Sequence, residues 1–91
     1  MKFIEGTKVC VSIQTLYNSF PQLTFGEIVP DFGDTDYYDL YNEDGELACL
    51  DGEEVIIEQV GEQLITFRND NGESSIHFAL TYKEAEMAII K

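Results

Sequence analysis

The fold is decided by residues 55–80, which read VIIEQVGEQLITFRNDNGESSIHFAL. Three runs rich in β-branched and aromatic residues, Val55–Val60, Gln63–Asn69 and Ser74–Leu80, are separated by the pairs Gly61-Glu62 and Asn71-Gly72. The pattern predicts a three-stranded antiparallel meander with two-residue turns. In that register Phe67 lies opposite Ile56 and Ile76, and Ile65 lies opposite Phe78. One face of the meander is then apolar, and it consists of Ile56, Ile65, Phe67, Ile76, Phe78 and Leu80.

A short helix is predicted directly after the meander, from Tyr82 to Ile90. Thr81 and Glu84 have the spacing of a capping box, in which each side chain satisfies a free amide at the start of a helix. Isolated helices shorter than ~12 to 15 residues are marginal in water. We therefore expect the apolar side chains of this helix to pack on the sheet, namely Ala85, Met87, Ala88, Ile89 and Ile90.

The N-terminal third is predicted to contain two strands. Val9, Val11 and Ile13 alternate with other residues, which indicates a strand over Lys8–Gln14. The stretch Leu16–Pro21 favours a turn, because it contains Asn-Ser and ends in proline. A second strand is expected over Leu23–Val29.

The middle of the chain is predicted to form a hairpin after an acid-rich loop at residues 31–36. Tyr37–Tyr41 is a strand by its aromatic content. Asp44-Gly45 predicts a tight turn with both residues at positive φ, and Glu46–Leu50 is the return strand, closed by Asp51-Gly52.

These elements predict a mainly β (α+β) protein. The expected architecture is a small bent antiparallel sheet or SH3-like partial barrel of about six or seven short strands with one C-terminal helix. Residues 1–91 are expected to form a single domain, since 91 residues and 10.3 kDa leave room for one hydrophobic core.

The charge of the chain excludes several classes of partner. Eighteen Asp and Glu residues against five Lys and Arg residues give a net charge of −13 and a pI of about 4.1. Such a protein repels phosphate backbones and anionic lipids, so neither direct nucleic-acid binding nor membrane binding is expected. No apolar run approaches the ~20 residues that a membrane helix needs, and Glu5 interrupts any signal-peptide core. These features predict a soluble, cytoplasmic protein.

The acidity is concentrated in one segment. No Lys, Arg or His occurs between Lys8 and Arg68, whereas thirteen acids lie there, as many as the whole net charge. The five acids elsewhere balance the five bases. The thirteen acids are Glu27, Asp31, Asp34, Asp36, Asp39, Glu43, Asp44, Glu46, Asp51, Glu53, Glu54, Glu58 and Glu62.

No catalytic or cofactor motif is present in the sequence. His77, the single histidine, falls in mid-strand opposite Thr66 and away from the apolar face, so it is interpreted as a surface residue. Cys10 and Cys49 are interpreted as buried thiols, because two distant cysteines make neither a disulfide framework nor a metal knuckle. Carboxylates cluster at Asp31, Asp34, Asp36 and Asp39 without the spacing of a calcium loop. No enzyme activity, metal or cofactor is therefore expected.

The favoured hypothesis is a non-enzymatic acidic protein that occupies the basic site of a nucleic-acid-binding protein. Side chains at i and i+2 of a strand lie ~6.6 to 7 Å apart, a spacing comparable with that of successive phosphates, so carboxylates on strands can mimic a nucleic acid. Small size, acidity and the lack of catalytic motifs are similar to those of phage-type inhibitors of host defence, such as anti-CRISPR and antirestriction proteins. The expected binding residues are Asp31, Asp34, Asp36, Tyr37, Tyr38, Asp39, Tyr41, Glu43, Asp44, Glu46, Glu53 and Glu54.

The alternative is a small accessory protein-interaction module. In that case an edge strand or the tyrosines would carry binding, and the acids would serve solubility only. At least one of Tyr37, Tyr38 and Tyr41 is expected to pack inward, because alternate side chains of a strand face opposite sides of the sheet.

Overall fold

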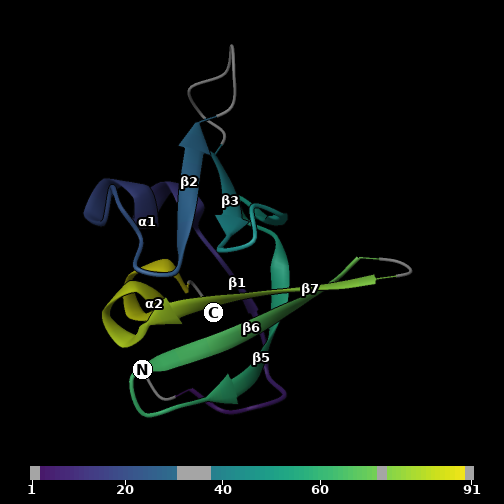
Figure 1. Ribbon diagram of the computed structural model, residues 1–91. Helices are drawn as coiled ribbons and strands as arrows, with labels where there is room; N and C mark the ends of the chain where they lie inside the picture. The colour runs from purple at the N-terminus through teal and green to yellow at the C-terminus, as the bar shows by residue number, and fades with distance from the viewer. Residues whose placement is uncertain (1–2, 31–37, 72–73, 90–91) are drawn as a thin grey trace.

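A computed structural model describes residues 3–30, 38–71 and 74–89, and within them the fold is mainly β, as predicted (Figure 1). Seven strands form two antiparallel sheets, and two short helices accompany them. The first sheet has the order β1-β5-β6-β7, with strands Lys8–Cys10, Glu54–Val60, Leu64–Asn71 and Ser74–Thr81. The second sheet has the order β2-β3-β4, with strands Gly26–Pro30, Tyr38–Asn42 and Leu47–Leu50.

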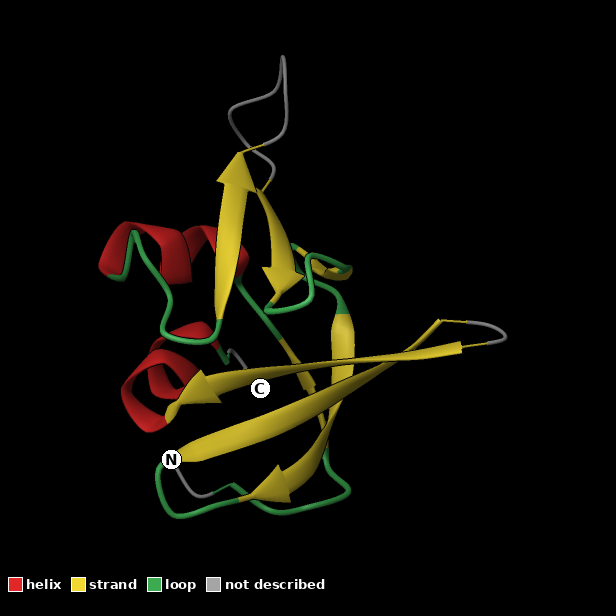
Figure 2. Cartoon of the chain, viewed as in Figure 1, coloured by secondary structure: helices red, strands yellow, loops and turns green. Residues whose placement is uncertain are grey.

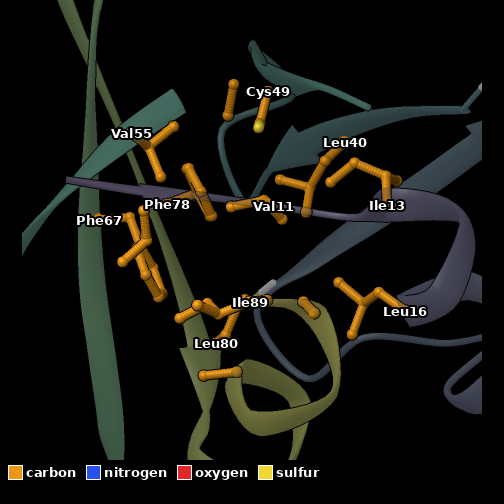
Figure 3. Close-up of a cluster of buried hydrophobic side chains, with 14 of the residues drawn as sticks. Val11, Ile13, Leu16, Leu40, Cys49, Val55, Phe67, Phe78, Leu80 and Ile89 are labelled. Atoms are coloured by element: carbon orange, nitrogen blue, oxygen red, sulfur yellow. The ribbon is translucent and has the colours of Figure 1, made fainter. Parts of the chain in front are cut away.

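The core lies where the inner faces of both sheets meet the two helices. Phe67 and Phe78 stack with ring centroids 5.0 Å apart, and Leu40 of the second sheet reaches the same cluster. Figure 3 shows Val11 between these aromatic rings and the side chains of Ile13 and Leu40. One continuous hydrophobic cluster therefore joins the two sheets.

The predicted register of the meander is wrong, although most of its core face is right. Phe67 pairs with Ile57 and Phe78, and Ile65 pairs with Leu80. Asn71 is the last residue of β6 and pairs with Ser74 of β7, so it is not a turn residue. Gly72 lies outside the described residues. The shift along β7 is two residues, which preserves the face of each side chain. Ile76 consequently packs at the margin of the core, where it is partly buried.

A β-bulge explains why Ile56 is not in the core. The register of β5 against β6 shifts between Ile57 and Gln59. In the turn that joins β5 to β6, the Gly61 amide donates to the Leu64 carbonyl at 2.9 Å. An extra residue on one strand reverses the side of the sheet to which the side chains beyond it point. Ile57, 1% exposed, therefore takes the core position that the sequence pattern assigned to Ile56.

Residues 13–19 form a helix, α1 (Ile13–Ser19), instead of the predicted strand end and turn. The Ser12 side chain caps it by accepting from the Thr15 amide, and Asp51 accepts from the amides of Ile13 and Gln14 at 2.6 and 3.3 Å. Ile13 and Leu16 lie three residues apart and are both fully buried. β1 accordingly ends at Cys10.

The C-terminal helix, α2 (Tyr82–Ala88), is confirmed together with its capping box. It packs against α1 and against the end of β7 (Figure 2). Ala85, Ala88 and Ile89 are buried as expected, whereas Met87 is 46% exposed. Ile90 lies outside the described residues. Neither helix in the described part of the chain is long and apolar enough to cross a membrane.

Candidate protein-binding face

The outer face of the second sheet carries two rows of side chains. Its register places Glu27 beside Tyr41, and Tyr41 beside Leu47. The next row contains Val29, Asp39 and Leu50. Directly paired side chains share one face of a sheet, so these six residues lie together, while Ile28 and Leu40 point inward into the core.

This outer face is both apolar and acidic. Val29, Leu47 and Leu50 are 37%, 42% and 45% exposed, and they account for three of the five large exposed hydrophobic residues in the described chain. Glu27 is exposed and Asp39 is half-buried. No Lys, Arg or His occurs anywhere in residues 26–50. The face therefore has a mixed aliphatic and aromatic surface whose only charges are negative.

The β3–β4 turn extends the acidic surface beyond the sheet. Gly45 has φ +81, and its amide donates to the Asn42 carbonyl at 3.0 Å. No described residue other than glycine has positive φ, so the predicted turn with Asp44 in that conformation is wrong. Glu43 and Asp44 occupy the exposed tip, where no described residue donates a hydrogen bond to either carboxylate.

Asn42 holds this turn against the first sheet. Its side-chain oxygen accepts from the amides of Asp44 and Glu46, and its side-chain nitrogen donates to the His77 carbonyl at 2.9 Å. The same nitrogen donates to a Glu46 carboxylate oxygen at 3.1 Å. Because Asn42 is 8% exposed and fully bonded, it fixes the position of the acidic tip relative to β7.

Tyr38 and Tyr41 point to opposite sides of β3. Tyr38 packs against the core and stacks on Tyr17 of α1, with ring centroids 5.0 Å apart. Tyr41 lies on the outer face between Glu27 and Leu47. Of these two, only Tyr41 lies on the outer face of the second sheet.

The remaining predicted binding residues are dispersed. Glu53 is occupied inside the protein, because its carboxylate accepts from the Leu50 amide and from the Asn69 side chain, at 3.0 and 2.8 Å. Glu54 lies on the outer face of the first sheet, in a hollow shared with Lys8 and Arg68. Four further expected residues lie outside the described chain: Asp31, Asp34, Asp36 and Tyr37.

The outer face of the first sheet carries charges of both signs. Lys8, Ile56, Arg68 and His77 form one row across its four strands, so His77 lies opposite Arg68 and not opposite Thr66. Arg68 contacts carboxylates of Asp70 and Glu58 at 2.9 and 3.5 Å, and His77 contacts Glu58 at 3.1 Å. Hydrogen bonds from Ser75 and Arg68 lower the pKa of Asp70, and the bond to Asp70 raises the pKa of Arg68.

Neither cysteine forms a disulfide. Cys49 is buried, and desolvation together with the nearby carboxylates of Glu53 and Asp51 raises the pKa of its thiol to about 12. Cys10 is only half-buried, which corrects the expectation that both thiols are buried. In the described part of the chain no three His, Cys, Asp or Glu side chains are grouped to hold a metal ion.

No protein-family model, curated protein or solved structure matches this chain. The assignment of a function therefore depends on the geometry of the protein itself.

The sequence pattern missed the aliphatic part of the outer face. The pattern places Val29, Leu47 and Leu50 in strands without a binding role, and it includes Glu27 in the acidic segment but not among the expected binding residues. Alternation of Glu27, Ile28 and Val29 in β2 was the available signal, because a buried Ile28 requires both neighbours to face outward. The arrangement can bind a protein surface that combines cations with apolar side chains.

Proposed function

We propose that this chain is a non-enzymatic binding protein whose second sheet occupies the basic site of a nucleic-acid-binding partner. The observation that carries the proposal is the face itself. Glu27 and Asp39 lie on an exposed sheet surface, Glu43 and Asp44 extend it, and the segment that forms it has no cation.

The availability of these carboxylates supports the proposal. Asp51 and Glu53 are needed inside the protein as hydrogen-bond acceptors. Glu27, Asp39, Glu43 and Asp44, in contrast, accept no side-chain hydrogen bond from any described residue. A partner's Lys and Arg residues can pair with these four without breaking native contacts, so complementarity adds to affinity and to the rate of association.

The spacing of the charges also suits mimicry of a nucleic-acid strand. Glu27 is directly opposite Tyr41, and Asp39 is two residues before Tyr41 on the same face. Such diagonal neighbours are separated by ~7 to 8 Å, close to the ~6.6 to 7 Å between alternate side chains of one strand. Glu27 and Asp39 therefore have a spacing comparable with that of successive phosphates.

The apolar content of the same face favours a second candidate, an accessory protein-interaction module. Val29, Leu47 and Leu50 would make contacts whose strength does not depend on ionic strength. Nucleic-acid mimicry and this alternative therefore differ in how salt affects binding, since counterion-dependent affinity falls steeply with added salt.

The test uses a tagged protein and two matched triple variants. The site variant combines Glu27→Lys, Glu43→Lys and Asp44→Lys, and the control variant combines Glu54→Lys, Glu62→Lys and Glu86→Lys. All six side chains are exposed and both variants change the net charge equally. Each bait is incubated with host lysate, washed, and eluted with a salt gradient or with an excess of oligonucleotide.

Mimicry predicts that the natural protein and the control variant retain a nucleic-acid-binding protein that salt and oligonucleotide both release. The site variant should retain none of it, because like charges brought together across an interface cost several kcal/mol. Retention that survives the site variant and is unaffected by oligonucleotide contradicts mimicry. If that retention also resists salt and is lost in Leu47→Ser, the accessory module is the correct function.

A further inference from the structure

An open hollow of about 460 Å³ lies on the outer face of the second sheet, between β2 and the β3–β4 turn. Two of its lining residues are glycines, Gly26 and Gly45, and neither fills it with a side chain. A Cβ atom on Gly26 would approach the Tyr41 carbonyl oxygen to 2.6 Å, so β2 and β3 are packed too closely there for any other residue. At Gly26 and Gly45 the lining is therefore backbone.

The walls of the hollow combine an aromatic ring with carboxylates. Tyr41 and Val29 supply apolar surface, and two acids are exposed there, Glu27 of β2 and Glu43 of the turn after β3. No cation within residues 26–50 neutralises these acids. Glu27 is the register partner of Tyr41, and Glu43 follows Tyr41 by two residues along the chain, so both acids line the hollow together with Tyr41.

This combination suits a guanidinium group better than an ammonium group. A guanidinium is planar and weakly hydrated, stacks on aromatic faces and donates to two carboxylates at once from its fixed fork of N–H groups. A lysine ammonium is strongly hydrated and acts as a point charge. The hollow, about 460 Å³ in volume, is open to solvent and has room for a guanidinium group.

We propose that the hollow receives an arginine side chain of the partner, and that Leu47 and Leu50 contact apolar side chains next to that arginine. The inference rests on the proposed function, because it takes for granted that this face binds a basic protein. It adds that the partner is recognised by arginine in preference to lysine, and that its basic site carries apolar residues.

A second copy of this chain does not fit the hollow. The sequence contains a single arginine, Arg68, and that side chain is held by Asp70 and Glu58 on the opposite sheet. Pairing two copies through this face would also bring Glu27, Asp39 and Glu43 of each against the same acids of the other, and such like-charge contact opposes association.

Two synthetic peptides of equal length and charge test the inference. One alternates arginine with leucine and the other alternates lysine with leucine. Binding of each to the natural protein is measured by calorimetry at physiological salt, and amide shifts are followed by NMR. We expect about two- to five-fold tighter binding of the arginine peptide, the gain of a partly exposed cation–π contact, with the largest shifts at Gly26, Tyr41 and Gly45.

Variants separate the ring from the carboxylates. Tyr41→Leu should abolish the preference for arginine and leave binding of the lysine peptide nearly unchanged, whereas Tyr41→Phe should keep the preference. Glu27→Gln with Glu43→Gln should weaken both peptides, and Glu62→Gln, remote on the β5–β6 turn, should weaken neither. If Tyr41→Leu does not fold, Tyr41→Phe and the NMR map on the natural protein decide.

Three results would overturn the inference. Equal binding of both peptides to the natural protein excludes an arginine site, as do amide shifts confined to other surfaces. If the peptides bind equally but the site variant with Glu27→Lys, Glu43→Lys and Asp44→Lys loses both, only the arginine preference fails and the proposed function stands. If the site variant binds both peptides unchanged, the proposed function fails too. A dimer in sedimentation that Leu47→Ser disperses would show that a second copy covers this face.

Discussion

Asn42 joins the second sheet to the first through one side chain. It makes four hydrogen bonds, two of them to amides of the acidic turn and one to the His77 carbonyl of β7. Asn69 makes a parallel connection from β6 to the Ala48 carbonyl of β4 and to Glu53. Both side chains are buried, and neither bond pattern can be read from hydrophobic periodicity.

Replacing Asn42 with alanine is expected to destabilise the fold by about 1 to 3 kcal/mol, the cost of leaving buried polar groups without partners. The His77 carbonyl and the amides of Asp44 and Glu46 all lose their partner. Urea unfolding monitored by circular dichroism measures the change. Asn18→Ala, at an exposed position of α1, is the control and should stay within ~0.5 kcal/mol. If Asn42→Ala unfolds at the same urea concentration as the natural protein, other contacts position the turn.

The two cysteines should differ in reactivity toward iodoacetamide. The pKa of the Cys49 thiol is raised to about 12 by burial, so it remains a neutral thiol in the native protein. Cys10 is half-buried and reachable. At mildly alkaline pH, mass spectrometry should find Cys10 modified in buffer and Cys49 modified only in urea. Rapid native modification of Cys49 would mean that β4 opens on the timescale of labelling.

The same burial makes stability depend on alkaline pH. A group whose pKa is higher in the folded protein stabilises it fully below the unfolded value, here the ordinary 9.0, and loses that contribution as pH rises toward about 12. Stability should therefore fall between these two pH values, and Cys49→Ala should reduce the fall. A pH profile of the urea midpoint for both proteins provides the measurement.

At the level of elements, the bulge in β5 decides which isoleucine is in the core. Ile57→Ala should cost about 2 to 5 kcal/mol, since Ile57 is 1% exposed and pairs with Phe67. Ile56 faces the outer side between Lys8 and Arg68, so Ile56→Ala should cost distinctly less. Denaturant midpoints of the two variants test the register. Equal losses would place the bulge elsewhere.

Much of the secondary structure could be predicted because it is encoded locally. The capping box of α2 requires only Thr81 and Glu84, and the strands of the meander are dense in β-branched and aromatic residues. The register could not be predicted. The bulge in β5 and the turn after Gly61 change which residues pair, while the alternation of apolar and polar residues along the sequence shifts by no more than one residue.

Helix α1 could not be predicted because distant residues stabilise it. Its sequence contains Thr15, Asn18 and Ser19, which are poor helix formers. Asp51, far along the chain, supplies the acceptor for its first amides. Ser12 was the local signal, since a serine before a short run with apolar residues three apart is typical of a capped helix.

The candidate site was predictable in its charge and not in its surface chemistry. Composition alone shows that residues 26–50 are free of cations. Which side of β3 faces outward depends on tertiary packing, which buries Tyr38 against Tyr17 and leaves Tyr41 outside. Exposure of Leu47 and Leu50 likewise follows from the irregular register of β3 with β4.

Across the whole molecule, the two sheets differ in electrostatic character. The outer face of the first sheet contains Lys8 and Arg68 beside Glu54, Glu58 and Asp70, and Arg68 pairs with Glu58 and Asp70. The charged residues in the second sheet are all acids. The net charge of the whole chain is −13. Repulsion is therefore concentrated in one layer, which a cationic partner can relieve.

Segregation of charge makes stability respond to salt in a position-dependent way. We expect the melting temperature of the natural protein to rise from low ionic strength to 0.15 M, where the Debye length is about 8 Å and repulsion within the second sheet is screened. The variant with Glu27, Glu43 and Asp44 changed to Lys should melt higher at low salt and respond less to added salt. Each exposed charge contributes at most ~1 kcal/mol, so the gain should be modest and the fold unchanged.

The variant with Glu54, Glu62 and Glu86 changed to Lys removes the same share of the net charge and is the control. Glu54 shares a hollow with Lys8 and Arg68, so a lysine there adds a third cation beside these two and should not stabilise the fold. Melting curves of the three proteins at several salt concentrations show whether the melting temperature depends on where the acids lie or only on the net charge. If the two variants shift identically, net charge alone governs stability and the acidic layer stores no repulsion for a partner to release.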